Sequence, residues 1–399
     1  MRKTYRIIAA AVLACCVQFG AAAEGFEQDR FAIGFWVDPP ADQLTPKRYE
    51  EIADAGFSVV IGMHPRSEEE IERQLRLCKR NGLKLIASRP PSDDERWANH
   101  AACWGYTLRD EPSLGDFAAL AERADALRRR YPDRLPYVNL FPTYASAEQL
   151  GTETYEEHVR QFMEIYRPEV LSMDHYPYMT PESDTRDDYC ENLAVMRAHA
   201  MEAGVPFWNF FNIMPFGPHL DPTEAQVRWQ VNASLCYGAK GVLYFCYWSP
   251  RGDDFAKGGA ILNAVGTRTR HYDEAQRINH VLQQWGPTLM RLTSDAVLQV
   301  SGGDKAIDVL AGQPLANISE GNYRIGIFHT DDGTRAVLLM NDDYAYAAWP
   351  TVEFESDAVQ EVSPRDGAIA PVQDNSPDMP GLQLSLDAGA ARLFLLKSR

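Results

Sequence analysis

Positive charge is scarce in this chain. Its 399 residues include 39 lysines and arginines against 56 aspartates and glutamates, which gives a formal net charge of −17. Nucleic acids and anionic membrane surfaces are bound by clustered basic side chains, and the sequence contains no basic stripe of that kind. We therefore expect no nucleic-acid partner.

Other chemical signatures are missing as well. The sequence has no C-x-x-C pair, no His/Cys cluster with zinc-type spacing and no glycine-rich phosphate-binding loop. After the first 23 residues, no apolar run reaches the ~20 residues that a membrane span requires. We therefore expect no metal, no other cofactor and no membrane span.

The first residues have the three regions of a secretory signal. Met1-Arg2-Lys3 is basic, the segment 7–16 is apolar, and Ala21-Ala22-Ala23 offers a small-residue cleavage site. We expect residues 1–23 to be a signal peptide and the protein to be exported, to the periplasm or the cell exterior. The segment 12–15 is an alternative, lipoprotein-type site that would place a lipid anchor on Cys15.

Eight short β-rich segments alternate with amphipathic segments of helical period. The expected strands are 31–37, 58–63, 84–88, 106–111, 136–141, 170–176, 206–212 and 241–248. The clearest expected helices are 67–81, 114–131, 154–166, 187–203, 222–237 and 272–292. This rhythm predicts an α/β fold, a (β/α)8 TIM barrel over residues 24–293. A doubly wound open sheet is the structural alternative, but it would usually carry the phosphate-binding loop that is missing.

Residues 294–399 have a different sequence pattern from the barrel segment. Short alternating strands are separated by turn sequences such as Asp-Asp-Gly and Ser-Pro. The expected strands are 324–329, 335–340, 351–355, 359–362, 382–386 and 391–396. This pattern predicts a small C-terminal β-sandwich, which could bind sugar or serve as a structural appendage packed on the barrel.

Acidic residues end two of the predicted barrel strands. The segment 105–112 closes with Asp110, Glu111 and Pro112, and the proline ends the strand. Alternation directs Glu111 into the lumen, with Arg109 one layer below, and it directs Asp174 inward on the sixth strand. The C-terminal ends of barrel strands carry catalytic residues. Each acid also has a structural alternative, because Asp110-Glu111 could cap the following helix and Asp174 could pair with Arg109.

Further polar and aromatic side chains lie at or near strand ends and are candidates for substrate binding. They are Trp36, Asp38, His64, Arg109, Asn139, Tyr176, Asn209, Tyr247 and Trp248. Aromatic rings suit the apolar faces of sugars, and asparagine amides can bind ring hydroxyls with both donor and acceptor atoms. Two carboxyl groups that flank a glycosidic bond can divide its hydrolysis between them. Trp36 and Trp248 could equally plug the top of the barrel.

The barrel segment resembles the clan A glycoside hydrolases, whose acid/base is the Glu of an Asn-Glu-Pro-like motif at the end of strand four. The matching motif here is Asp110-Glu111-Pro112. The resemblance implies that Glu111 is the general acid/base, and that Asp110 takes the place of the asparagine that contacts the sugar 2-hydroxyl. It covers residues from about 31 to 248, which is the extent of the predicted strands.

The clan A pattern also implies a nucleophilic Glu at the end of strand seven, and the segment 206–212 contains no acid. Three alternatives remain open: Asp174 takes the second role, the substrate's own N-acetyl group attacks as in families 18 and 20, or the barrel binds sugar without cleaving it. We favour the first alternative, an exported glycoside hydrolase with Glu111, Asp174 and Asp110 as catalytic residues. Its substrate would be an oligosaccharide or polysaccharide. The rival is a non-catalytic carbohydrate-binding barrel.

Overall fold

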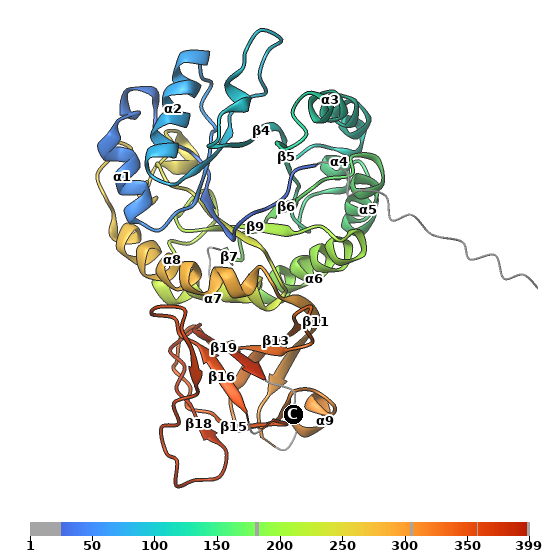
Figure 1. Cartoon of the computed structure of the whole chain (residues 1–399), viewed down its shortest axis with the longest axis vertical. Coiled ribbons are helices and arrows are strands. Elements are labelled where there is room, and N and C mark those ends of the chain that lie inside the picture. The colour runs from blue at the N-terminus through green and yellow to red at the C-terminus, as the bar shows by residue number, and fades with distance from the viewer. Residues whose placement is uncertain (1–24, 180–182, 304–305, 357, 397–399) are drawn as a thin grey trace, which may run out of the picture.

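The computed structural model describes residues 25–179, 183–303, 306–356 and 358–396; the expected signal peptide, residues 1–23, lies outside the described residues. Eight parallel strands form one sheet in the order β5-β4-β3-β2-β1-β10-β9-β6. The ring closes between β5 and β6, where the backbone N–H of Leu140 donates to the carbonyl of Ser172 at 2.8 Å. The predicted (β/α)8 barrel is confirmed (Figure 1).

Each of the eight predicted strand segments overlaps one strand of this ring. The strands are β1 (Ala32–Phe35), β2 (Val59–Ile61), β3 (Lys84–Ala87), β4 (Cys103–Asp110), β5 (Leu135–Asn139), β6 (Leu171–Asp174), β9 (Phe207–Asn212) and β10 (Gly241–Phe245). A short hairpin, β7 (Tyr178–Met179) with β8 (Ser183–Asp184), follows β6. Most strands are buried throughout, as expected for a parallel sheet covered on both faces.

The helices cover the outside of the ring. They are α1 (Pro46–Asp54), α2 (Glu68–Arg80), α3 (Phe117–Arg130), α4 (Ala147–Leu150), α5 (Tyr155–Ile165), α6 (Arg186–Ala203), α7 (Glu224–Cys236) and α8 (Arg270–Leu289). Between β3 and β4 the chain forms only the 3-10 turn η2 (Trp97–Asn99). Pro90 and Pro91 disfavour a helix in that connection.

Large aromatic side chains fill the lumen. The rings of Trp104 and Trp208 stack with centroids 6.0 Å apart, and Tyr137 lies 5.9 Å from Trp208. Gly241 makes room for them, because a Cβ at that position would lie 2.5 Å from Cδ1 of Trp208. The barrel is therefore a packed core rather than a pore, and chemistry can take place only at its mouths.

Residues after α8 form the predicted β-sandwich. One sheet contains β11 (Thr293–Ser301), β13 (Asn322–His329), β14 (Arg335–Asn341), β19 (Ala391–Leu396), β16 (Val359–Val362) and β17 (Ile369–Pro371). The other contains β12 (Leu315–Ile318), β15 (Thr351–Phe354) and β18 (Leu382–Gln383). The sequence did not predict β11, β12 or β17, nor the short helix α9 (Ala306–Leu310). A separate apolar core lies between the two sheets.

The β-sandwich packs beneath the barrel against α7 and α8 (Figure 1). Polar contacts from α7 fix it there. The indole of Trp229 donates to Asp342 Oδ1 at 2.9 Å, Asn232 Nδ2 donates to the carbonyl of Gly389 at 2.8 Å, and Arg228 donates to the carbonyl of Ala388 at 2.7 Å. These contacts give the β-sandwich a defined position beside the barrel.

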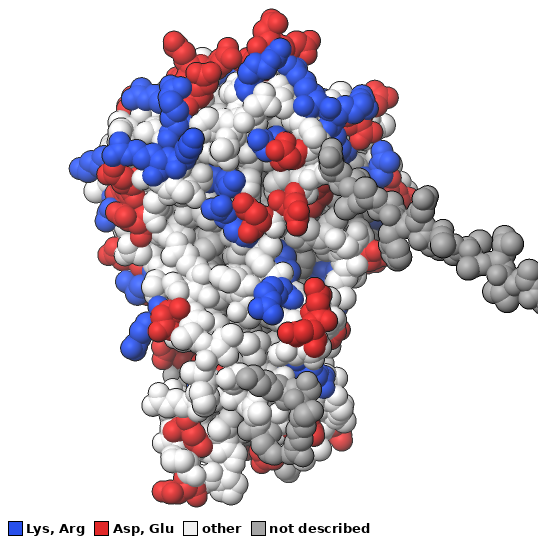
Figure 2. All heavy atoms as spheres, viewed as in Figure 1, with Lys and Arg blue, Asp and Glu red and all other residues white. Residues whose placement is uncertain are grey.

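Surface charge on the face shown in Figure 2 is mixed. Lysine and arginine side chains are scattered among aspartates and glutamates, and a broad uncharged area lies between them. Within the described ranges, no helix combines the length and the apolarity that crossing a membrane would take.

Candidate functional site

A β-bulge near the end of β4 decides which side chains reach the lumen. The pairing with β5 shifts between Thr107 and Arg109, so that Asp110 lies opposite Asn139. An extra residue in a strand reverses the alternation beyond it. Arg109, expected to point inward, and Asp110 are both exposed, but it is Asp110 that lies beside Asn139 at the mouth, with Oδ1 3.5 Å from Asn139 Nδ2. Among the described ion pairs, none joins Arg109 to Asp174.

Glu111 reaches the same mouth by an unusual backbone conformation. Its φ is +46°, in the left-handed region that non-glycine residues rarely adopt. Its backbone N–H still donates to the carbonyl of Asn139 at 2.8 Å, which continues the ladder one residue past β4. Strain of this kind costs roughly 1–3 kcal/mol and is concentrated at functional sites. Pro112 then directs the chain away from the sheet.

The amide of Asn139 joins two acids. Its Nδ2 donates to Asp174 Oδ1 at 2.8 Å and lies 3.5 Å from Asp110 Oδ1. On the opposite side, Ser172 Oγ donates to Asn139 Oδ1 at 2.9 Å, and Tyr137 OH lies 2.8 Å from Ser172 Oγ. Because the amide oxygen is occupied by a donor, both amide hydrogens are directed at the carboxylates. The two acids are therefore neighbours at one mouth of the barrel.

All three carboxyl groups bind protons more tightly than usual. Burial, and then the charge of Asp110, raises the pKa of Glu111 to about 7. Burial raises the pKa of Asp110 to about 6, against the opposing hydrogen bond from Asn139, although solvent reaches this side chain at the mouth. Burial and the charges of Glu111 and Asp110 raise the pKa of Asp174 well above its usual value. The cluster therefore exchanges protons near neutral pH.

Aromatic side chains surround the acids. Tyr176, whose hydroxyl hydrogen-bonds to Asp174, packs edge-on against Phe216 with centroids 5.1 Å apart, and lies 5.5 Å from Phe245. Tyr144 is 55% exposed as a whole residue. Its pKa is raised first by burial and then by the charges of Asp174 and Glu111, which lie close to it. Sequence reasoning missed Tyr144 and Phe216, because it considered only strand ends. Aromatic residues in the loops just beyond those ends were the available signal.

Trp36 lies at the top of the lumen, where it packs edge-on against Phe210 at 5.5 Å and its indole contacts Met63 Sδ at 2.8 Å. It is nearly buried, at 8% exposure. Phe210 and Asn212 are the residues of β9 nearest to this mouth, and Asn212 is fully buried. This strand therefore ends without a carboxylate.

Asp38 is a buried structural anchor. Its carboxylate accepts hydrogen bonds from Arg66 at 2.8 Å, Gln74 at 2.7 Å and the backbone of Met63 at 3.0 Å, with His64 Nδ1 at 3.1 Å. Burial alone would raise its pKa, but the hydrogen bond from His64 and the charge of Arg66 hold that pKa below its usual value. In the structure, Asp38 and His64 fix the segment after β2 to the end of β1, and their expected role in substrate binding stays a prediction.

Three further candidates lie away from the lumen. Asn209 is fully buried and donates to Tyr189 OH at 2.6 Å and Ser234 Oγ at 2.9 Å, on α6 and α7. Tyr247 is also fully buried, stacked on Phe35 with centroids 4.5 Å apart.

Trp248 is covered by the guanidinium of Arg48, 5.2 Å from its ring centroid, and by the backbone at Gly266. The structure therefore places Asn209, Tyr247 and Trp248 away from the acids and does not bring these expected substrate contacts together with them. In β9 the lumen-facing residues are in phase with Trp208, and the alternation fails beyond the end of β10.

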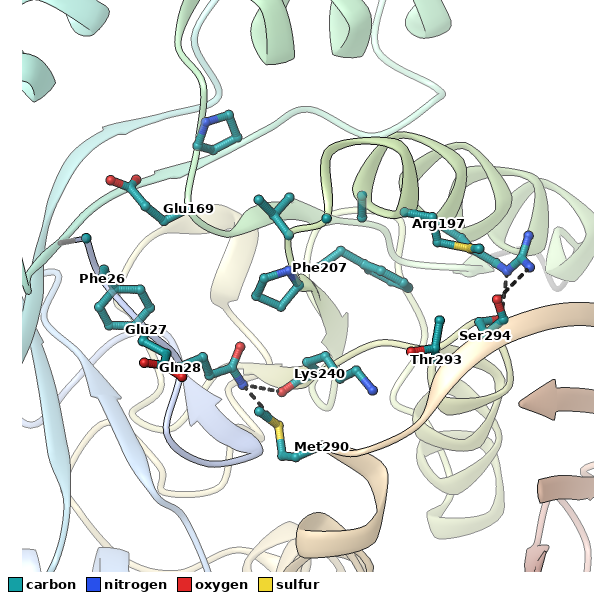
Figure 3. A pocket seen from close by; sticks show the side chains of 18 of the residues that line it. Phe26, Glu27, Gln28, Glu169, Arg197, Phe207, Lys240, Met290, Thr293 and Ser294 are labelled. Atoms are coloured by element: carbon teal, nitrogen blue, oxygen red, sulfur yellow. Dashed lines mark hydrogen bonds between the residues drawn. The ribbon is translucent and has the colours of Figure 1, made fainter. Parts of the chain in front are cut away.

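A large cavity lies at the other end of the barrel (Figure 3). It has a volume of about 800 Å³, and its lining includes Gln28 and Lys240, which precede β1 and β10, and Phe207, the first residue of β9. Gln28 Nε2 donates to the carbonyl of Lys240 at 2.7 Å, and Lys240 Nζ donates to the carbonyl of Leu289 at 2.5 Å. The ammonium group of Lys240 is thus engaged in a structural contact, and the cavity lies at the end of the barrel opposite the acids. Within the described residues, no group of His, Cys, Asp and Glu side chains is arranged to hold a metal ion.

Comparisons with known proteins show the fold. No protein-family model matches the chain, and no curated protein matches it in sequence. Among solved structures, it is similar to a catalytic mutant of a GH42 beta-galactosidase from G. stearothermophilus, with 8% identity, 93% of this chain and 99% of that chain covered, and a TM-score of 0.64. A beta-galactosidase from Bacillus circulans sp. alkalophilus gives 10% identity, coverage of 92% and 99%, and a TM-score of 0.60.

Proposed function

We propose that this protein is a glycoside hydrolase that acts at the C-terminal mouth of its barrel. One observation carries the proposal: the carboxyl groups of Asp110 and Asp174 share the amide of Asn139, beside a Glu111 whose pKa is about 7. Glycoside hydrolysis uses two carboxyl groups, one of which must stay protonated near the working pH. The fold shared with beta-galactosidases supports the same class of reaction.

In this proposal Glu111 donates a proton to the leaving oxygen. Its raised pKa keeps a large fraction protonated at neutral pH, and its half-buried position limits proton exchange with bulk water. Asp174 supplies the second carboxyl group. The donors on Asn139 and Tyr176 favour its ionised form, but burial and the charges of Glu111 and Asp110 outweigh them and raise its pKa, so Asp174 ionises when Glu111 and Asp110 hold protons. Asp110 supports the pair and can bind a sugar hydroxyl.

The aromatic side chains at the mouth would provide the sugar platform. Tyr144 and Tyr176 flank the acids, and their rings can stack on the apolar face of a pyranose. Trp36, at 8% exposure, would form the floor of the same subsite. The substrate would be an oligosaccharide or polysaccharide, and we propose a galactoside for the first assay. We also propose export, on the basis of the segment 1–23.

The test is turnover of aryl and alkyl glycosides by Glu111→Gln, with Glu122→Gln as the matched control on the exposed face of α3. Loss of a general acid lowers the rate about 10²–10⁴-fold. The loss should be larger for alkyl than for nitrophenyl glycosides, because a good leaving group needs little protonation. Near wild-type turnover of alkyl glycosides by Glu111→Gln would contradict the assignment.

A non-catalytic sugar-binding barrel is the second candidate. The absence of an acid in β9, which ends in the buried Asn212, favours it. Recovery of bound oligosaccharide uncleaved after prolonged incubation with the wild-type protein would support this candidate over hydrolysis.

A further inference from the structure

One loop of the β-sandwich leaves two large aromatic side chains in solvent. Residues 342–350 connect β14 to β15, and within them Tyr346 is 74% exposed and Trp349 is 75% exposed. Solvation of a tryptophan or tyrosine ring is unfavourable, and exposed aromatic side chains of this size are enriched where proteins bind ligands or partners. The two residues have no evident role in the core.

The loop is held in place by its own polar groups. Asp343 Oδ1 accepts hydrogen bonds from the backbone N–H groups of Ala345 at 2.6 Å and Tyr346 at 3.1 Å. Asn341 Nδ2 donates to the carbonyl of Tyr346 at 2.8 Å. Ala348 and Leu386 exchange two backbone hydrogen bonds of 2.8 Å. The aromatic side chains therefore project from an ordered backbone, which lowers the entropic cost of binding.

The same loop lines a polar hollow of about 410 Å³ next to the barrel. Arg186, Asn322, Asp342 and Tyr344 contribute to its wall. Arg324 Nη2 lies 3.0 Å from Asp342 Oδ2, Arg186 Nη1 donates to the carbonyl of Asp342 at 3.0 Å, and Asp343 accepts from backbone N–H groups of its own loop. The lining mixes two arginines with three aspartates, so it offers many hydrogen-bonding groups with little net charge, which favours a neutral polyhydroxylated ligand over an ion.

The loop also contacts the segment that carries one of the acids. Tyr344 packs edge-on against Tyr178 of β7, with centroids 5.5 Å apart, and the guanidinium of Arg186 lies 4.9 Å from the Tyr344 ring centroid. Tyr178 comes four residues after Asp174, the last residue of β6. The β-sandwich thus meets the rim of the candidate mouth at this loop.

We propose that residues 342–349 and the adjoining hollow form an accessory binding surface for a neutral polysaccharide chain, with Tyr346 and Trp349 as stacking platforms. Aromatic rings bind the apolar faces of sugars, and the hollow would bind their hydroxyl groups. The choice of carbohydrate as the occupant rests on the proposed function. The surface would hold a long substrate while its end or a branch enters the mouth.

The experiment uses Glu111→Gln protein, in which no cleavage is expected to interfere. Its mobility is measured in native gels that contain soluble galactan, arabinogalactan, xylan, glucomannan or starch. We expect retardation by at least one of these, and Tyr346→Ala/Trp349→Ala in the same background should raise the Kd by about tenfold or more, as loss of aromatic anchors does. Met379→Ala is the matched control, because Met379 is an exposed side chain (58%) on another loop of the β-sandwich.

Two results would overturn the proposal: no retardation by any of the five polysaccharides, or equal retardation of the parent and the double variant. Loss of self-association in sedimentation, with polysaccharide retention unchanged, would assign the loop to protein contacts and also refute it. Thermal unfolding checks that the double variant is folded. Failure of wild-type turnover on aryl glycosides would refute the hydrolase proposal alone, since retention is measured independently of cleavage.

Discussion

Asn139 is the residue whose replacement tests the acid cluster most directly. In Asn139→Leu the amide that contacts both Asp174 and Asp110 is lost, while the number and the branching of the side-chain heavy atoms are kept. The hydrogen bond favours the ionised carboxylates, so its removal raises the pKa of Asp174 and, less strongly, that of Asp110, whose contact is longer at 3.5 Å.

The magnitude follows from the strength of such bonds. A hydrogen bond to a charged group contributes roughly 1.5–3 kcal/mol, and one pKa unit corresponds to about 1.4 kcal/mol. Loss of the 2.8 Å bond to Asp174 should therefore raise its pKa by about one unit or more. If ionised Asp174 is required for turnover, the acidic limb of the pH–rate profile moves to higher pH by the same amount.

The assay is kcat/KM for an aryl glycoside between pH 4 and 9, for wild type and Asn139→Leu. On the acidic limb, the variant should be about tenfold slower at a given pH. Asn209→Leu is the matched control, because this asparagine is equally buried on a barrel strand but faces the helices. Asn209→Leu should lower the stability of the protein and leave the acidic limb of the pH–rate profile unchanged. An unshifted limb in Asn139→Leu, with the variant folded, would refute the assigned role of Asn139.

Two stability predictions follow from the same electrostatics. Burial raises the pKa of Glu111 above its usual 4.5 to about 7, so the fold favours the protonated form, and this stabilisation is complete below pH 4.5 and lost as the pH rises through 7. Glu111→Gln should therefore raise the free energy of unfolding at pH 8 by about 1–2 kcal/mol, a figure that allows for partial solvation of the side chain, and should change it little at pH 4. Equal changes in Tm at both pH values would contradict this prediction. Asp38→Asn leaves the guanidinium of Arg66 buried without its carboxylate and should lower the free energy of unfolding by about 3–5 kcal/mol in urea titration. His64→Ala, which removes a more exposed partner (37%), should cost far less, and equal costs would argue against the buried pair as the source.

Two departures from regular strand geometry at the end of β4 place the acids at the mouth of the barrel. Regular alternation would have delivered Arg109 and Glu111 to the lumen and kept Asp110 out. The bulge at Thr107–Arg109 instead puts Asp110 beside Asn139, and the left-handed conformation of Glu111 brings a second acid to the same edge. Two adjacent acids can thus lie at one mouth only because the strand departs from ideal geometry just before it ends.

The fold was predictable because it depends on local patterns that repeat. Eight β-rich segments with amphipathic spacers favour a closed parallel ring, and the turn-rich tail favours antiparallel strands, as the structure has them. The nine-residue β11 and the short β12 and β17 were not predicted, whereas the equally short β15 and β16 were, so strand length alone did not decide which strands could be recognised. The acids Asp110, Glu111 and Asp174 were also identifiable, since each ends a strand.

What the sequence could not decide was the direction of individual side chains. One inserted residue in β4, or a change of phase in β9, moves a side chain from the lumen to the helices. Neither changes the composition or the periodicity of the strand enough to be detected in its sequence. The separation of Asp38 from the acid cluster likewise depended on Arg66 and Gln74, which come from a different strand–helix unit. Strand identity is encoded locally, whereas the partners of a buried polar group are determined only when distant segments pack together.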